Sequence, residues 1–386
     1  MFASNSYDEA NKIKSNISKI LIGKNEDVVS VATEKEFVNG KIVYSVKIGL
    51  KENSILTIFK ILEQLTNEGM ISNDCIAHTD ISTYSNVFKQ EGQIVSHEIS
   101  ASDNTTPSIQ SKLKWLTNLF NKNKILVRPV SPGISVGHIN VSAGTVGAVV
   151  SDQKGNNYIL SNNHVLADTN KGKKGDPIIQ PGCSDGGTEE VAKLEHFNQI
   201  KMCGNENIVD IAIASLNEQF QLNCVIQNIG EPNDTILAQL GMEVEKNGRT
   251  TGHTKGKIEA TDADIKVGYD NGQKAVFINQ IKTQKMSFPG DSGSLLINKQ
   301  GTSVKAVGLI FAGSNTNSYA NHYYNVTNEL NANGYYTNFA KSTVAVNKKW
   351  LANKPRYVPY FGLAAIGLIT TYAYNTYHNS KNKPKI

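Results

Sequence analysis

The sequence Pro-Gly-Asp-Ser-Gly-Ser-Leu at residues 289–295 decides the fold of this chain. Glycine can adopt backbone conformations that a Cβ forbids, so the glycines flanking Asp291-Ser292 allow a tight turn that presents the serine hydroxyl. The same turn directs the amide N–H groups of Gly290 and Ser292 to one point, where a tetrahedral oxyanion could be held. A polar surface turn is the alternative for such a short motif, so its partners are decisive.

Two upstream segments supply what a serine nucleophile needs, a histidine base and a carboxylate that orients it. His164 follows the apolar run 158–160, and Asp210 lies within the otherwise apolar run 207–214. A charge buried there without a partner would be costly, so the aspartate needs one. Taken singly, each residue also fits a structural role. The chain order is His, Asp, Ser, which excludes the orders of subtilisins and α/β-hydrolases.

Together, the segments 160–165, 209–212 and 290–293 resemble the histidine, aspartate and serine motifs of the trypsin/chymotrypsin superfamily. The resemblance covers about residues 127–326. It implies a mainly β fold, a chymotrypsin-like double β-barrel of two six-stranded barrels with the triad in the cleft between them.

The resemblance also implies a role for each residue of the site. His164 is the general base and acid, Asp210 orients it, and Ser292 is the nucleophile, with the N–H groups of Gly290 and Ser292 forming the oxyanion hole. The predicted activity is that of a serine endopeptidase acting on protein or peptide through an acyl-enzyme, without metal or cofactor. An esterase shares this chemistry, and a catalytically silent, membrane-tethered peptide-binding module is the alternative outside enzymes.

A fourth segment, 246–256, resembles the Gly-Arg-Thr-Thr-Gly segment of alpha-lytic-type bacterial proteases. That resemblance implies that Arg249 pairs with Asp291 and supports the oxyanion hole without an activating cut. Arginine suits the task because it stays charged and can bond a carboxylate through two donors. An exposed turn arginine is the alternative.

The substrate pocket is expected, again by resemblance, between the residues just before the serine and a later strand. Met286, Ser287 and Phe288 line one wall, and the strand 308–313, with Ile310 and Phe311, lines the other. An apolar, polarizable lining favours cleavage after an apolar residue. Plain core packing explains the same residues equally well.

The composition of the chain limits its protein class, its partners and its compartment. The 386 residues are 39% hydrophobic and 19% charged, with a net charge of +5, as in a globular protein of two or three domains. The basic residues form no face interleaved with aromatics, so no nucleic-acid partner is expected. The four cysteines lack metal-ligand spacing, and Val165 follows His164 where secreted trypsins carry a cysteine. A reduced, cytoplasmic chain is therefore predicted.

Residues 1–95 are predicted to form a small α+β accessory domain. Ser6 and Glu9 indicate a capping box that opens a helix ending near Gly23. Two strand-like runs, joined across Asn39-Gly40, then predict a hairpin, and residues 55–65 predict a second helix. Its role stays open between inhibitory prodomain, regulatory sensor and folding aid. A linker with a short helix follows at 96–126, and an extension at 327–356 follows the protease domain.

Residues 357–377 carry no charge and contain the apolar run 361–369. As a helix, this segment would span about 31 Å, enough to cross a bilayer core. Lysines and an arginine flank it, and tyrosines lie near both ends, as in an interfacial aromatic belt. Pro359 and Asn375 lower its apolarity. We therefore expect a transmembrane tail anchor, with a docked or interfacial helix as the alternative.

Overall fold

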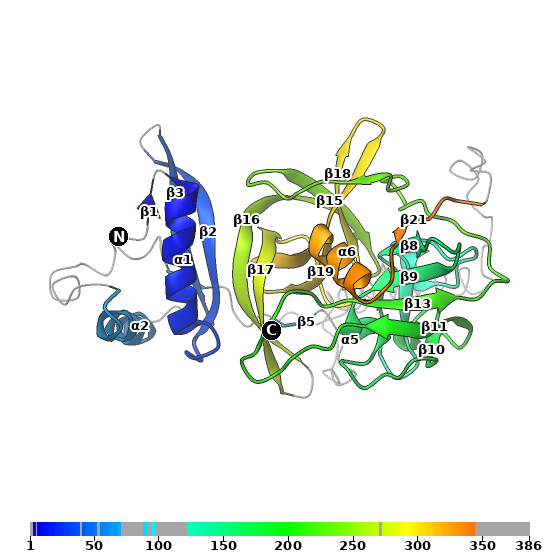
Figure 1. Ribbon diagram of the computed structural model, residues 1–386, viewed down its shortest axis with the longest axis horizontal. Coiled ribbons are helices and arrows are strands. Elements are labelled where there is room, and N and C mark those ends of the chain that lie inside the picture. Colours follow the sequence, from blue (N-terminus) through cyan, green and yellow to red (C-terminus); the bar gives the residue numbers. More distant parts are fainter. Residues whose placement is uncertain are drawn as a thin grey trace, which may run out of the picture. The chain divides into compact units, whose positions relative to one another are not determined.

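The computed structural model describes residues 3–4, 6–38, 41–51, 55–70, 88–90, 95–96, 122–269 and 272–343. Most of the predicted linker and the candidate membrane segment 357–377 lie outside these ranges. The described residues form a mainly β protein with few helices (Figure 1).

The α-helices are α1 (Tyr7–Leu21), α2 (Ile55–Asn67), α5 (Asn163–Leu166) and α6 (Tyr323–Ala332), and the 3-10 helices are η2 (Lys122–Lys124) and η3 (Cys183–Asp185). The strands are β1 (Ala3–Ser4), β2 (Val28–Val38), β3 (Lys41–Leu50), β4 (Phe88–Gln90), β5 (Val95–Ser96), β6 (Ser135–His138), β7 (Gly144–Thr145), β8 (Ala148–Ser151), β9 (Asn157–Ser161), β10 (Pro177–Ile179), β11 (Glu190–Phe197), β12 (Glu206–Asn207), β13 (Ala212–Leu216), β14 (Asp234–Thr235), β15 (Glu243–Gly248), β16 (Gly252–Gly268), β17 (Lys274–Gln284), β18 (Leu295–Gln300), β19 (Ser303–Gly313), β20 (Asn317–His322) and β21 (Asn338–Phe339).

A closed barrel carries the serine segment. Its six strands follow the order β16-β15-β18-β19-β20-β17, and β17 pairs again with β16 to close the ring. Strand β19 is buried on both faces because one face looks into the barrel and the other packs against neighbouring elements. The serine turn is the connection from β17 into β18.

A second sheet of eight strands, in the order β21-β8-β9-β13-β11-β10-β6-β7, carries the histidine and the aspartate. Together with the closed barrel, this sheet confirms the mainly β, chymotrypsin-like double-barrel fold that the resemblance implied. The sheet curls around its own apolar core as a half-barrel and has eight strands rather than six. Its end strands, β21 and β7, do not pair with each other within the described ranges. The reason is local: β7 has only two residues, and β21 from the C-terminal part covers the edge of β8.

One hydrophobic cluster joins the two sheets. Leu160 and Ile211 enter it from the curled sheet, Leu295 and Leu309 from the barrel, and Val326 from α6. Helix α6 lies against β19 (Figure 1). Because α6 crosses residue 326 and β21 lies beyond it, the fold that holds the site continues to residue 343, into the predicted extension.

The N-terminal residues form the expected helix, hairpin and second helix. Helix α1 lies along the β2–β3 hairpin (Figure 1) and packs against it over a separate apolar core. Ser6 occupies the position before α1, but its side chain makes no capping hydrogen bond. Strand β2 pairs antiparallel with β16, so the hairpin continues the barrel sheet.

Buried charges line the junction of α1 and β2 with the barrel. Lys14 Nζ lies 2.7 Å from Asp264 Oδ1, and Lys282 Nζ lies 3.2 Å from Glu34 Oε1. All four side chains are less than a tenth exposed. Residues 1–344 accordingly form one compact unit.

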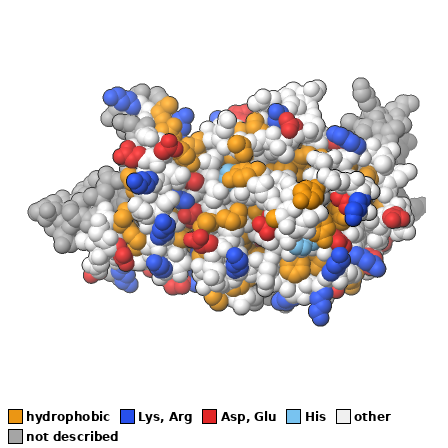
Figure 2. Space-filling model, in the orientation of Figure 1, with side chains coloured by type: hydrophobic (Ala, Val, Ile, Leu, Met, Phe, Trp, Pro, Cys, Tyr) orange, Lys and Arg blue, Asp and Glu red, His pale blue; other side chains and the backbone are white. Residues whose placement is uncertain are grey.

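The described part of the chain contains no helix long and apolar enough to cross a membrane. On the face shown in Figure 2, acidic and basic side chains are interspersed, and hydrophobic side chains occur among them.

Candidate active site

His164 and Asp210 meet because two neighbouring strands bring them together. Strand β9 ends at Ser161 and leads directly into α5, whose second residue is His164. Asp210 comes just before β13, which pairs with β9 so that Ala212 faces Ser161. His164 Nδ1 lies 2.6 Å from Asp210 Oδ2, and the backbone N–H of His164 donates to Oδ1 at 3.3 Å. Both side chains are fully buried.

Three residues that sequence reasoning missed hold Asp210. Asn321 accepts a hydrogen bond from the Asp210 N–H at 3.0 Å, and Asn162 donates to its carbonyl at 2.7 Å. The Tyr269 hydroxyl donates to Oδ2 at 3.4 Å, and its ring lies edge-on to His164. Asn162 lay within the quoted histidine segment, whereas Asn321 on β20 and Tyr269, directly after β16, come from distant parts of the chain and gave no sequence signal.

The turn that carries Ser292 has the glycine-dependent geometry expected from its sequence. Gly290 and Gly293 have φ values of +93° and +91°. A Cβ on Gly293 would lie 2.1 Å from Ser161 Oγ and 2.2 Å from the Thr145 carbonyl oxygen, so no other residue fits. The Ser292 carbonyl accepts from the Thr145 N–H at 2.8 Å. The serine turn therefore lies against the end of β9, three residues before His164. Ser292 Oγ donates to the Phe311 carbonyl at 3.2 Å.

The predicted partner of Asp291 is wrong. Arg249 instead pairs with Asp185, the last residue of η3, through Nε at 2.8 Å and Nη2 at 2.5 Å. The cation beside Asp291 is Lys246, whose Nζ lies 3.3 Å from Oδ2 with both side chains fully buried. The alternation of side chains along β15 explains why Lys246, and not Arg249, reaches Asp291, since residues 246 and 248 share one face of the strand. A Cβ on Gly248 would lie 2.4 Å from Asp291 Oδ1, so this face looks at the serine turn.

Four other donors reach the Asp291 carboxylate. They are the N–H groups of Thr250 at 2.8 Å, Thr251 at 3.1 Å and Phe288 at 2.9 Å, and the Thr251 hydroxyl at 2.7 Å. Burial alone would raise the pKa of Asp291, but Lys246 and these donors outweigh it and hold the pKa below its ordinary value. The turn therefore holds a buried, ionised carboxylate directly before Ser292.

The predicted pocket residues contribute mainly to the interior of the barrel. Met286 and Ile310 belong to one buried cluster, and Phe311 packs against Phe277 with ring centroids 4.8 Å apart. The Ser287 hydroxyl donates to Ser318 Oγ at 2.7 Å. The structure thus favours the core-packing alternative for the three apolar residues.

Phe288, expected in the same wall, is exposed, and beside it lies Lys285, which the sequence did not single out. The Lys285 ammonium group lies 4.6 Å from the centroid of the exposed Phe288 ring and donates to the Ser314 carbonyl at 2.5 Å. Burial lowers the pKa of Lys285 to about 8, against a smaller opposing effect of Asp291.

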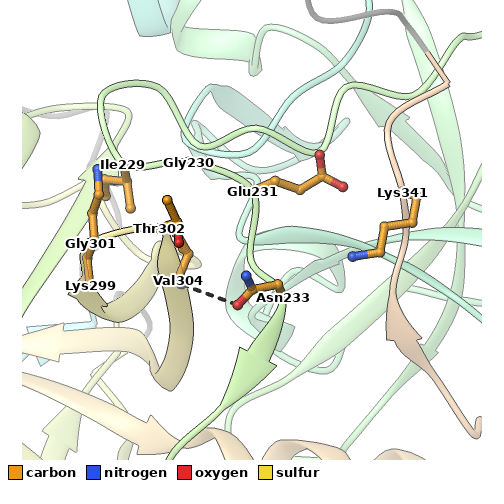
Figure 3. A pocket seen from close by; sticks show the side chains of 9 residues that line it. All are labelled: Ile229, Gly230, Glu231, Asn233, Lys299, Gly301, Thr302, Val304 and Lys341. Atoms are coloured by element: carbon orange, nitrogen blue, oxygen red, sulfur yellow. Dashed lines mark hydrogen bonds between the residues drawn. The ribbon is translucent and has the colours of Figure 1, made fainter.

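No group of three or more candidate metal ligands occurs among the described residues. A surface pocket lies elsewhere, beside the β18–β19 hairpin, where Asn233 accepts a hydrogen bond from the Val304 N–H at 3.2 Å (Figure 3). Its lining also includes Glu231 and Lys341 and none of the predicted site residues.

Comparison with known proteins adds one match to a family model, described as trypsin, over residues 136–332. Among solved structures, the chain is similar to a glutamic acid specific serine protease, with 19% identity over 55% of this chain and 100% of the other and a TM-score of 0.39. It is also similar to a Nocardiopsis protease, at 18% identity, 55% and 100% coverage and a TM-score of 0.39. A chymotrypsin of Cellulomonas bogoriensis matches at 18% identity, 55% and 99% coverage and a TM-score of 0.38. No curated protein matches the sequence.

Proposed function

This chain belongs to the trypsin family of serine endopeptidases, and from that premise we propose that His164, Asp210 and Ser292 are its catalytic triad. The observation that carries the proposal is the buried contact of 2.6 Å between His164 Nδ1 and Asp210 Oδ2. A carboxylate at Nδ1 keeps the proton on that nitrogen and leaves Nε2 as the base. A buried carboxylate also stabilises the imidazolium that forms during the reaction.

The proposed reaction uses each of these groups in turn. His164 Nε2 takes the proton of Ser292 Oγ as the oxygen attacks a peptide carbonyl carbon. The N–H groups of Gly290 and Ser292 stabilise the oxyanion. His164 returns the proton to the leaving amine, and water, deprotonated by the same imidazole, releases the acyl group. For attack, the Ser292 hydroxyl must give up its hydrogen bond to the Phe311 carbonyl.

Labelling with a fluorophosphonate probe tests the proposal. We expect the full-length chain to label, Ser292→Ala to lose the label, and Ser215→Ala, which changes a serine of β13 away from the turn, to keep it. Labelling that survives Ser292→Ala would contradict the assignment. An absence of labelling in the unmodified chain would favour the catalytically silent peptide-binding module.

The substrate of such an enzyme is a protein or peptide. The preference for an apolar residue before the cleaved bond stays a prediction, and residues other than Met286, Ile310 and Phe311 must determine it, since these three pack inside the barrel. Cleavage of a peptide library varied at that position tests it. A preference for a charged residue there would contradict it.

We also propose that residues 357–377 tether the enzyme to a membrane with its body in the cytoplasm. The support is the uncharged run and its basic flanks. Replacing Ile366 and Leu368 by lysine should release the protein from membranes into the soluble fraction, because charges at the centre of a spanning helix are costly. Asn379→Lys, outside the run, serves as the control. Retention of the double variant under alkaline carbonate extraction would contradict a tether.

A further inference from the structure

The amide groups that form the oxyanion hole are set by the peptide planes of the serine turn. In a trans peptide the C=O and N–H point in opposite directions, so a bond that holds the carbonyl also sets the N–H. We propose that the Thr250 hydroxyl is the positioning group that directs the Gly290 N–H into the oxyanion hole. The inference rests on the proposed function and assigns a residue that the triad does not include.

The first observation concerns the plane between Pro289 and Gly290. The Thr250 hydroxyl donates to the Pro289 carbonyl at 2.7 Å. On the opposite side of that plane is the Gly290 N–H, one of the two predicted oxyanion donors. Gly290 has φ +93°, a region that glycine enters without steric cost. Local sterics therefore do not fix this plane, and a bond from outside the turn is needed.

The second observation is that Thr250 is itself held from two sides. Its N–H donates to Asp291 Oδ1 at 2.8 Å, and Arg249 Nη1 donates to its hydroxyl oxygen at 3.2 Å. Because a hydroxyl has one proton, accepting from Arg249 leaves that proton for the Pro289 carbonyl. Arg249 is in turn fixed by its two bonds to Asp185. Arg249 thus acts on the oxyanion hole through Thr250 rather than through Asp291.

Residues other than Thr250 bond the two following peptide planes of the turn, so the role of Thr250 can be tested separately. The Ser292 N–H lies opposite the Asp291 carbonyl, which accepts from the N–H of Ser294 at 3.0 Å and from its hydroxyl. The peptide plane between Gly290 and Asp291 is fixed by the Thr145 hydroxyl, which donates to the Gly290 carbonyl at 2.8 Å. Loss of the Thr250 hydroxyl should therefore loosen one oxyanion donor and leave the second in place.

The test compares Thr250→Val with Thr250→Ser in the full-length protein. Valine keeps the branched shape and removes the hydroxyl, whereas serine keeps it. The readout is inactivation by an alkyl fluorophosphonate, whose phosphoryl oxygen uses the same hole, resolved into kinact and KI. Loss of one oxyanion donor costs about 100- to 1,000-fold in rate, so a loosened donor should lower kinact by about 10- to 100-fold with KI within about twofold. Thr250→Ser should stay within about threefold of the unmodified enzyme.

The control is Thr327→Val on α6, where a half-buried threonine hydroxyl also donates to a backbone carbonyl, at 2.9 Å. It should leave kinact unchanged. Thermal melting checks folding, and Thr250→Ala, with the same expected loss, decides the question if Thr250→Val does not fold. A kinact within twofold for the hydroxyl-free variants overturns the inference while the proposed function stands. If the unmodified enzyme shows no Ser292-dependent inactivation, the proposed function fails first.

Discussion

Replacing Lys246 by methionine tests whether the buried ion pair beside Ser292 holds the turn. Methionine keeps most of the apolar stem and removes the charge. It leaves the Asp291 carboxylate fully buried without its cation, and breaking one side of a buried pair usually costs about 3–5 kcal/mol. Four hydrogen-bond donors still reach Asp291, so we expect about 3 kcal/mol, the low end of that range.

The matched control is Lys305→Met. Lys305 Nζ lies 3.3 Å from Asp234 Oδ2, the same separation as in the buried pair, but the two side chains are 35% and 58% exposed. Exposed pairs of this kind contribute about 0–1 kcal/mol. Because the two ion pairs have the same separation, the difference in stability loss between the two variants reports the effect of burial.

The assay is urea denaturation, followed by fluorophosphonate labelling of the folded variants. Lys246→Met should lower the free energy of unfolding by about 3 kcal/mol and slow labelling, because Asp291 directly precedes the proposed nucleophile, Ser292. Lys305→Met should change neither by a measurable amount. A loss below about 1 kcal/mol for Lys246→Met, equal to the control, would refute the reasoning that this pair matters because it is buried.

Three further outcomes are expected. Asp210→Asn should fold normally yet lower kcat by roughly 10⁴-fold, because the amide favours the wrong tautomer of His164; activity within tenfold of the unmodified enzyme would contradict the triad. Gly293→Ala should abolish labelling, since its Cβ would overlap Ser161 and Thr145, whereas Gly301→Ala, with φ +60° and open space around it, should retain full labelling in the same assay. Between pH 8 and 10.5 the unfolded chain binds a proton at Lys285 that the folded protein does not, so this group makes stability rise with pH there. Urea midpoints of the unmodified protein and Lys285→Met should therefore diverge across that window, and parallel midpoints would exclude the lowered pKa.

The residues that the chemistry requires could be identified from the sequence, as the contact between His164 and Asp210 illustrates. A buried aspartate in an apolar strand needs a partner, and a histidine in the right chain order offers one. The barrel around Ser292 follows for a related reason: short apolar runs separated by glycines pair as strands. These inferences hold because each concerns one residue and an unavoidable physical demand.

Side-chain contacts that depend on strand register or on tertiary packing were harder to predict from the sequence. Arg249 and Lys246 lie three residues apart, and which of them faces Asp291 depends on the register of the β15–β16 hairpin. The period of two along β15 could have indicated Lys246, because Gly248 on the same face leaves room for the carboxylate. Asn321 and Tyr269 gave no comparable signal, since only the closed barrel brings them to Asp210. For Met286 and Ile310, hydrophobicity alone could not distinguish a pocket wall from a core.

The pairing of β2 with β16 has a consequence for cooperativity. Separating residues 1–70 from the barrel would break the buried ion pairs of Asp264 and Lys282 and remove the pairing of β16 with β2. The two parts should therefore melt together, as one calorimetric transition whose van't Hoff enthalpy matches the measured heat. In that sense the hairpin behaves less as an appendage than as part of the barrel sheet, and its folding should share a single equilibrium with the assembly of the proposed catalytic site.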